Sequence, residues 1–273
     1  MTMRSAKTKA MILTRIAPVA IVAVIGALAG TAPAQAAEET HALKSVHFSF
    51  DGPFGTFDRA QLQRGYKVYV EVCASCHSMD LLAFRNLSEE GGPDFTPDQV
   101  RVLAADFPRE VIDGPDDVGD MFERPGKPSD NFPPPFPNQA AARASNNGAL
   151  PPDFSVLAKA RQGGAEYIYS LLTGYEDAPA HMEMRDGSYY NPYFPGGQIS
   201  MAPPLSDELV EYTDGSPMTM EQYSKDISAF LMWTAEPKME ERKRIGFQVM
   251  VFLVVLGGLL YFTKQKLWRD VEH

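Results

Sequence analysis

The sequence of 273 residues predicts a mainly α-helical protein with long proline-rich loops and one C-terminal transmembrane helix. Apolar residues recur at helical spacing in several short segments, and few segments show the strict alternation of a half-buried strand. The stretches between them are rich in proline, glycine, asparagine and aspartate, which favour turns and loops. One long apolar run near the C-terminus has the usual length of a membrane-spanning helix.

The first 36 residues are typical of a secretory signal peptide. Their beginning is basic and has no acidic residue, with Arg4, Lys7, Lys9 and Arg15. An apolar stretch follows over residues 16–30, and Ala34-Gln35-Ala36 provides a cleavage site of the Ala-x-Ala type. This order of segments indicates a signal peptide, with a retained N-terminal anchor as the alternative. We therefore expect residues 37–243 to form an exported domain.

The exported domain begins with an extended lead-in and a predicted helix over residues 59–72. Asp58 is a suitable N-cap for this helix, and Gln61 stands three positions later, as in a capping box. Helical spacing continues through Leu62, Tyr66, Tyr69, Val70 and Cys73. The helix would therefore end where a pair of cysteines begins.

Further helices are predicted by the same signals. Thr96 and Pro97 open one, because proline is favoured at the first helical position. Short helices are expected near residues 155–161 and 163–173. Thr219 with Gln222 opens a last soluble helix, which ends at Pro237. Residues 107–153 have little periodicity and are expected to be either a functional loop or a disordered insertion, and residues 178–218 are again expected to be loop.

A transmembrane helix is predicted over residues 244–263. Only Gln248 is clearly polar between positions 245 and 262, and basic residues stand on both sides of this run. A buried core helix is the alternative, but nothing would require it to be flanked by basic clusters at both ends. If the signal peptide exports residues 37–243, the tail at residues 264–273 lies in the cytoplasm.

The charge balance limits the class of partner. Residues 1–36 hold four basic and no acidic residues, so the formal charge changes from −10 for the whole chain to −14 without them. Such an acidic domain repels nucleic acid and attracts a basic protein at rates that fall with salt. The acidity could instead serve solubility alone.

The segment Cys73-Ala74-Ser75-Cys76-His77 is the Cys-x-x-Cys-His signature of covalent haem attachment. Two thiols about one helical turn apart can form thioethers to two haem vinyl groups, and the adjacent histidine can bind the iron. A zinc site would need a second pair of ligands, a thioredoxin-like dithiol would need a preceding strand, and a disulfide would not need His77. We therefore expect one covalently bound haem c and a c-type cytochrome fold.

The second axial ligand of the iron is less clear from the residues. His/Met ligation would raise the reduction potential and close the iron to other ligands. Met201 lies in Ser200-Met201-Ala202-Pro203-Pro204, where two prolines restrict the backbone. Other candidates in the exported domain are His41, His47, His181, Met182 and Met184.

Several longer segments resemble the cytochrome c1 family, the haem subunits of the quinol–cytochrome c oxidoreductase or cytochrome bc1 complex. These segments are VCASCHSMD at 72–80, FPNQAAARASNNGALPPDFSVLAKAR at 136–161, YIYSLLTGY at 167–175 and NPYFPGGQISMAPPLSD at 191–207. The resemblance covers nearly the whole mature chain in order, including the single C-terminal span. The two longest segments are much more specific than the haem signature, which many cytochromes share.

The resemblance implies roles for individual residues. Cys73 and Cys76 would hold the haem, His77 would be the fifth ligand and Met201 the sixth. Arg143 is expected near a haem propionate, although a solvated surface arginine is the alternative. Some bacterial members carry an extra cysteine pair that stiffens the methionine loop; this chain has no further cysteine, so proline and packing would have to replace it.

The implied function is electron transfer in a respiratory chain. The haem domain would lie in the bacterial periplasm. A single helix would anchor it in the inner membrane, which is either the cytoplasmic or the intracytoplasmic membrane. It would take electrons from the Rieske iron–sulfur protein and pass them to a soluble or membrane-tethered cytochrome c. Cytochrome b and membrane lipid would be its other partners, in a dimeric complex. The chain would carry no acid–base catalyst of its own, although the whole complex is an enzyme.

Three other functions remain possible from the residues alone. A membrane-anchored cytochrome c could serve a terminal oxidase, but the family-specific segments argue against this. A haem sensor or peroxidase would have an open sixth position and would bind cyanide or carbon monoxide. A structural membrane subunit without haem would give no haem stain on a denaturing gel.

Overall fold

The computed structural model describes residues 41–271, so the predicted signal peptide at residues 1–36 lies outside the described part of the chain. Helices predominate, as expected. The longer ones are α2 (Arg59–Glu71), α3 (Pro97–Ala105), α4 (Gln139–Ser145), α5 (Gly164–Leu172), α6 (Met220–Ala235) and α7 (Met239–Leu267). Short 3₁₀ helices are η1 (Cys73–Ser75), η2 (Phe84–Ser88) and η3 (Pro195–Gly197).

Two small antiparallel hairpins complete the fold. Strand β1 (Val111–Asp113) pairs with β2 (Phe122–Arg124), with Ile112 opposite Glu123. Strand β3 (Tyr189–Tyr190) pairs with β4 (Gln198–Ile199), with Tyr189 opposite Ile199. Both hairpins lie within the segments that the sequence predicts as loops, and they account for the sheet in the described residues.

Three helix starts form as predicted because their signals are local. The Asp58 side chain accepts a hydrogen bond from the Gln61 amide at 3.2 Å. Thr96 and Gln99 form a capping box at the start of α3, and the Thr219 hydroxyl caps α6. These side chains satisfy amides that have no partner within the helix.

One predicted helix is wrong. Residues 155–161 form a series of turns, and α5 starts only at Gly164. The side chain of Asp153 accepts a hydrogen bond from the Ser155 amide at 2.8 Å. Such a local side-chain bond offers the backbone a turn in place of the first turn of a helix.

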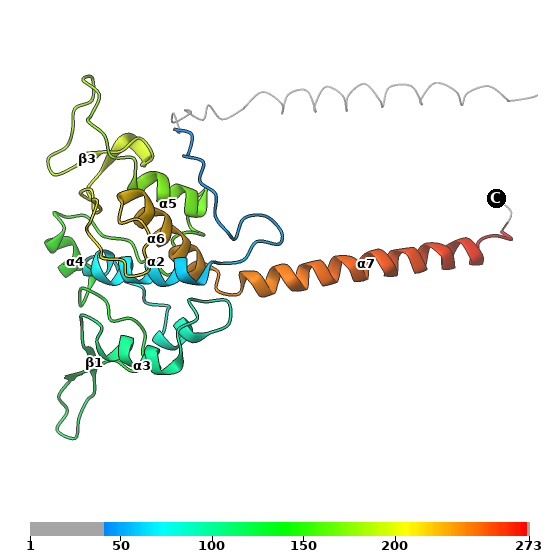
Figure 1. Ribbon diagram of the computed structural model, residues 1–273, viewed down its shortest axis with the longest axis horizontal. Coiled ribbons are helices and arrows are strands. Elements are labelled where there is room, and N and C mark those ends of the chain that lie inside the picture. The colour runs from blue at the N-terminus through cyan, green and yellow to red at the C-terminus, as the bar shows by residue number, and fades with distance from the viewer. Residues whose placement is uncertain (1–40, 272–273) are drawn as a thin grey trace, which may run out of the picture. The chain divides into compact units, whose positions relative to one another are not determined.

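At the centre of the domain, α2 packs against α6, and α5 also packs against α6 (Figure 1). Gly65 permits this close approach, because a Cβ there would lie 2.3 Å from the Asp226 carbonyl oxygen. Aromatic side chains fill the core around the contact; Tyr69, Phe132 and Phe230 are each at most 1% exposed. Burying such side chains contributes about 1.5–3 kcal/mol each.

A buried carboxylate joins α2, α6 and the segment between them. Asp226 is fully buried and accepts hydrogen bonds from the side chains of Gln61, Arg64, Tyr212 and Gln222. Arg64 also pairs with Asp214 at 2.8 Å. A buried charge is tolerated when it is paired and fully hydrogen-bonded, so this cluster fixes the loop before α6 to the helical core.

Helix α7 could span a membrane. Its 29 residues would extend about 43 Å at 1.5 Å per residue, more than the roughly 30 Å of a hydrocarbon core. The large apolar side chains of residues 245–262 are exposed; Val254, for example, is 71% exposed. The helix is longer than the predicted span of residues 244–263, because residues 239–243 form its first turn and residues 264–267 continue its last.

Candidate haem-binding site

The end of α2 positions the two cysteines. The helix stops at Glu71, and η1 then turns the chain so that the amides of Cys76 and His77 both donate to the Cys73 carbonyl, at 3.1 and 2.9 Å. Both cysteines are free and half-buried. One helical turn therefore presents two thiols and an imidazole from adjacent backbone positions.

The thiol of Cys73 is not an activated nucleophile in this structure. Burial, together with the neighbouring Cys76, raises its pKa to about 12. A redox-active dithiol needs a cysteine whose pKa is lowered, so this environment argues against the thioredoxin-like alternative. In the described residues, no group of three or more His, Cys, Asp or Glu side chains is arranged to hold a metal ion.

The ring of His77 is held on two sides. Its Nδ1 lies 2.9 Å from the carbonyl oxygen of Pro152, and its ring stacks on Phe154 at 4.1 Å between centroids. Because a carbonyl only accepts, Nδ1 carries the proton and the Nε2 lone pair is left for a metal. Burial lowers the pKa of His77, against the opposing effects of Pro152 and Asp153. The imidazole is therefore neutral, as an iron ligand must be.

Asp153 binds the segment of residues 152–154, which supports His77, to the segment that follows the cysteines. Its carboxylate accepts hydrogen bonds from the Ser78 hydroxyl at 2.7 Å and the Asp80 amide at 2.9 Å. The Phe154 amide donates to the Ser78 carbonyl at 2.8 Å. Burial alone would raise the pKa of Asp153, but these bonds and those from Ser155 outweigh burial and lower it. The carboxylate is thus ionised at neutral pH.

Met201 is held from its main chain. The Tyr175 hydroxyl donates to the Met201 carbonyl at 3.0 Å, and Met201 itself is half-buried. The β3–β4 hairpin before it is fixed by Asn191, which is fully buried and donates from its side chain to the Leu171 carbonyl at 2.7 Å. Hydrogen bonds, as well as the expected prolines, therefore restrict this loop.

The other candidate ligands are less suitable. His41, His47 and His181 are exposed, and His47 pairs with Asp51 at 3.2 Å. Met182 and Met184 are half-buried on the loop before β3. The candidate histidines are thus exposed, whereas the candidate methionines are half-buried.

Arg143 lies at the surface of α4. Its Nη1 donates to the Gly148 carbonyl at 3.0 Å, and the side chain is exposed. A role for Arg143 toward a propionate stays a prediction.

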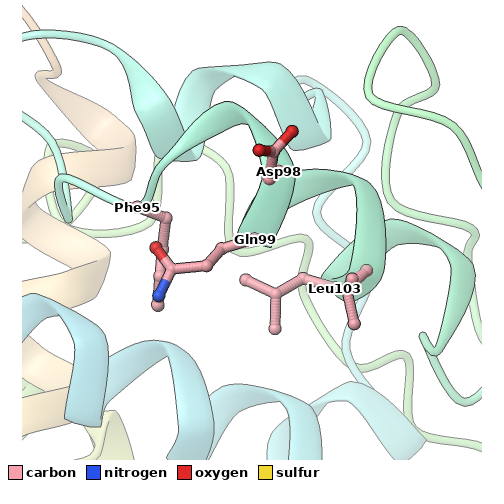
Figure 2. Close-up of a pocket in the computed structure, with 5 residues that line it drawn as sticks. Phe95, Asp98, Gln99 and Leu103 are labelled. Carbon is pink, nitrogen blue, oxygen red and sulfur yellow. The ribbon is translucent and has the colours of Figure 1, made fainter.

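Two shallow pockets differ in their relation to these residues. One, of about 440 Å³, is lined by Tyr175, Tyr189, Tyr190 and Pro203 and so borders the Met201 loop. The other, of about 350 Å³, lies on α3 and is lined by Phe95, Gln99, Val102 and Leu103, together with Asp98. Figure 2 shows Asp98 directed away from the other labelled side chains of this second pocket.

The donor set fits a covalently bound haem. Two free thiols, one neutral imidazole with its Nε2 available and a thioether on an anchored loop are the groups that such a haem needs. The support of His77 by Pro152, Asp153 and Phe154 was not predicted from the sequence. The only local signal was the Asp153-x-Ser155 spacing of a side-chain turn.

A helical domain with this donor set, followed by a helix that could span a membrane, is typical of a membrane-attached c-type cytochrome. Residues 48–271 match the family model for the cytochrome C1 family. The chain belongs to the cytochrome c1 family, whose members are the electron-transfer haem subunits of the cytochrome bc1 complex. The earlier resemblance is confirmed.

Curated relatives agree with this assignment. The chain is 47% identical to cytochrome c1 of Blastochloris viridis over 91% of its own length and 94% of that protein. It is 46% identical to cytochrome c1 of Rhodospirillum rubrum, with 96% and 100% covered. It is 54% identical to cytochrome b/c1 of Bradyrhizobium diazoefficiens over 82% of its length, but it spans only 35% of that longer protein.

Proposed function

We propose that this chain binds one haem c through thioethers to Cys73 and Cys76, with His77 and Met201 as the axial ligands. The observation that carries the proposal is the support of His77, the residue directly after Cys76: its Nδ1 lies 2.9 Å from the carbonyl oxygen of Pro152. That contact fixes the tautomer and the ring, as second-sphere partners of metal-binding histidines do. Arg143 would pair with a propionate.

The bound haem would supply reversible one-electron iron chemistry. The chain's own residues would bind and orient it: the cysteines fix its position, Phe154 packs on the histidine, and Tyr175 holds the Met201 main chain. Thioether ligation favours a high reduction potential. No proton transfer by a side chain is required, so the chain contributes potential, burial and docking to the complex.

We place the chain in the quinol–cytochrome c oxidoreductase complex. It would take electrons from the Rieske iron–sulfur protein and pass them to a c-type cytochrome, soluble or tethered, and quinol would be oxidised on other subunits. The name cytochrome b/c1 of the Bradyrhizobium relative supports cytochrome b as a neighbour. A dimeric complex is part of the same proposal.

The proposed topology follows from the two ends of the chain. Residues 1–36 would be removed, residues 37–243 would lie in the periplasm, residues 244–263 would span the inner membrane among its lipids, and residues 264–273 would lie in the cytoplasm. The exported domain would be strongly acidic and would attract a basic acceptor, so its electron-transfer rate should fall as ionic strength rises.

The ligand assignment is tested by comparing Met201→Leu with Met184→Leu, a change on the preceding loop. Met201→Leu should abolish the weak near-infrared band of sulfur-to-iron charge transfer in the oxidised protein and lower its reduction potential sharply. Met184→Leu should change neither. If Met201→Leu keeps the band and the potential, Met201 is not the ligand.

A further inference from the structure

The start of α7 is bound to the first residue of α2 and to the loop that precedes it. Glu240 accepts a pair of hydrogen bonds from Arg59, at 2.9 and 2.8 Å, and another from the Phe57 amide at 2.8 Å. Met239, at the first position of α7, is 2% exposed. Bidentate arginine–carboxylate pairs fix geometry as well as charge. The first turn of α7 is therefore part of the folded domain.

The next turn of α7 holds the tip of the same loop. The Lys243 ammonium donates to the carbonyls of Phe50 and Gly55, at 2.6 and 3.1 Å. One turn further along, the ring of Phe247 contacts the ring of Phe54 edge-on, with 5.6 Å between centroids. The loop tip and α7 thus remain in contact as far as the apolar run that begins at Ile245.

The loop holds Phe54 outward although its neighbours are buried. Phe48 is 1% and Phe57 is 4% exposed, whereas Phe54 is 73% exposed. A tight turn produces this arrangement, because a Cβ on Gly55 would lie 2.2 Å from the Asp51 carbonyl oxygen. The Asp51 carboxylate in turn accepts a hydrogen bond from the Phe48 amide at 2.8 Å.

A single exposed aromatic side chain is ordinary on a protein surface. Phe54 differs because its contact, Phe247, lies two residues inside the apolar run, only about 3 Å along the helix axis from its beginning. If α7 crosses a membrane, Phe54 must lie near the rim of the hydrocarbon core. Arg242 and Arg244 lie within about 8 Å of Phe247 along the helix axis, on the side where basic side chains would meet lipid headgroups.

We propose that Phe54 is a membrane-interface anchor, inserted into the lipid interface beside the first turn of the span. Apolar aromatic side chains are favoured in that layer, and basic residues beside them add attraction to anionic lipid. The inference rests on the proposal that α7 spans the membrane. The haem domain would then attach to the membrane at two points, the helix and the loop, which restricts its tilt over the lipid surface.

Site-directed spin labelling of the full haem-loaded chain, in nanodiscs of phosphatidylcholine and phosphatidylglycerol, tests this inference. Single cysteines are introduced by Phe54→Cys, by Val254→Cys in the middle of the apolar run and by Phe122→Cys on β2. Val254 and Phe122 are 71% and 44% exposed, so all three positions can carry a nitroxide. The chain without an added cysteine measures any labelling of Cys73 and Cys76.

Collisions of each nitroxide with oxygen, which enters lipid, are compared with collisions with a water-soluble nickel chelate. The ratio of oxygen to nickel accessibility should be highest at position 254, intermediate at 54 and lowest at 122. If the accessibility ratio at position 54 is as low as at position 122 while the ratio at position 254 is high, Phe54 is not a membrane anchor, although α7 still spans the membrane. If the ratio is low at both positions 54 and 254, α7 does not span the membrane. Exclusion of both reagents at 54 overturns lipid as the partner and indicates a protein surface.

Discussion

The hydroxyl of Tyr175 donates a hydrogen bond of 3.0 Å to the main-chain carbonyl of Met201. Tyr175 follows the end of α5, which packs on α6, so the contact connects the proposed ligand loop to the helical core. Burial raises the pKa of Tyr175, so the phenol stays protonated and remains a donor at physiological pH. The loop is thereby held without a disulfide.

Replacing Tyr175 with phenylalanine should loosen Met201 without unfolding the domain. The lost hydrogen bond is worth about 0.5–1.5 kcal/mol, which is a factor of about 2 to 10 in an equilibrium constant. The oxidised protein should therefore bind cyanide or imidazole more tightly by that factor, as measured by optical titration. Tyr189→Phe is the control, because Tyr189 lines the same neighbouring pocket as Tyr175. An equal effect of both changes would remove the specific role of Tyr175.

The parts of the fold that could be predicted are those set by neighbouring residues. Helix starts at Asp58, Thr96 and Thr219 each depend on a side chain and an amide three positions later. The cysteine motif is likewise complete within five residues. The hairpin of β1 and β2 was not predicted, because three-residue strands carry too little periodicity to be distinguished from loop.

The support of His77 could not be predicted for a different reason. Pro152 lies 75 positions after His77, and the pairing depends on how the intervening segment returns to α2. The same Asp153 that anchors this return also accounts for the wrong prediction over residues 155–161, because its side chain bonds the Ser155 amide. The spacing of apolar residues predicts a helix there, and it carries no information about a side-chain hydrogen bond that forms a turn instead.

Asp153 should make the stability of the haem domain depend on pH. Its pKa is lowered in the folded protein, so its contribution is fully present above the unfolded pKa of about 4 and is lost as the pH falls through the folded value. Asp153→Asn should therefore lower the melting temperature near pH 7, and the difference from the unchanged chain should shrink toward pH 3. Melting is followed by circular dichroism in the haem band.

The exposed Asp98 is the matched control for this change, because it lies in the first turn of α3 and pairs with Arg101 rather than with the segments that support His77. Asp98→Asn should alter the melting temperature little at either pH, since exposed pairs such as Asp98 with Arg101 contribute about 0–1 kcal/mol at most. A constant difference between Asp153→Asn and the unchanged chain at all pH values would show that the charge of Asp153 is not the stabilising feature.

The approach of α2 to α6 leads to a last prediction, for Gly65→Ala. The added Cβ would lie 2.3 Å from the Asp226 carbonyl oxygen and 2.6 Å from the Phe230 Cβ, and main-chain atoms cannot move aside as a side chain can. Overpacking of this kind costs about 1–3 kcal/mol. Because α2 ends at Glu71, two residues before Cys73, a shift of the helix should also disturb the haem spectrum.

Gly246→Ala provides the comparison within another helix. A Cβ at Gly246 meets nothing within 4 Å, and alanine is favoured over glycine inside a helix by about 0.5–1 kcal/mol. Thermal melts of the full chain in detergent should show a melting temperature several degrees lower for Gly65→Ala and unchanged or slightly higher for Gly246→Ala. Equal melting temperatures for the two variants would mean that α2 and α6 do not pack at the distance described, and the position of the cysteine segment would then need another explanation.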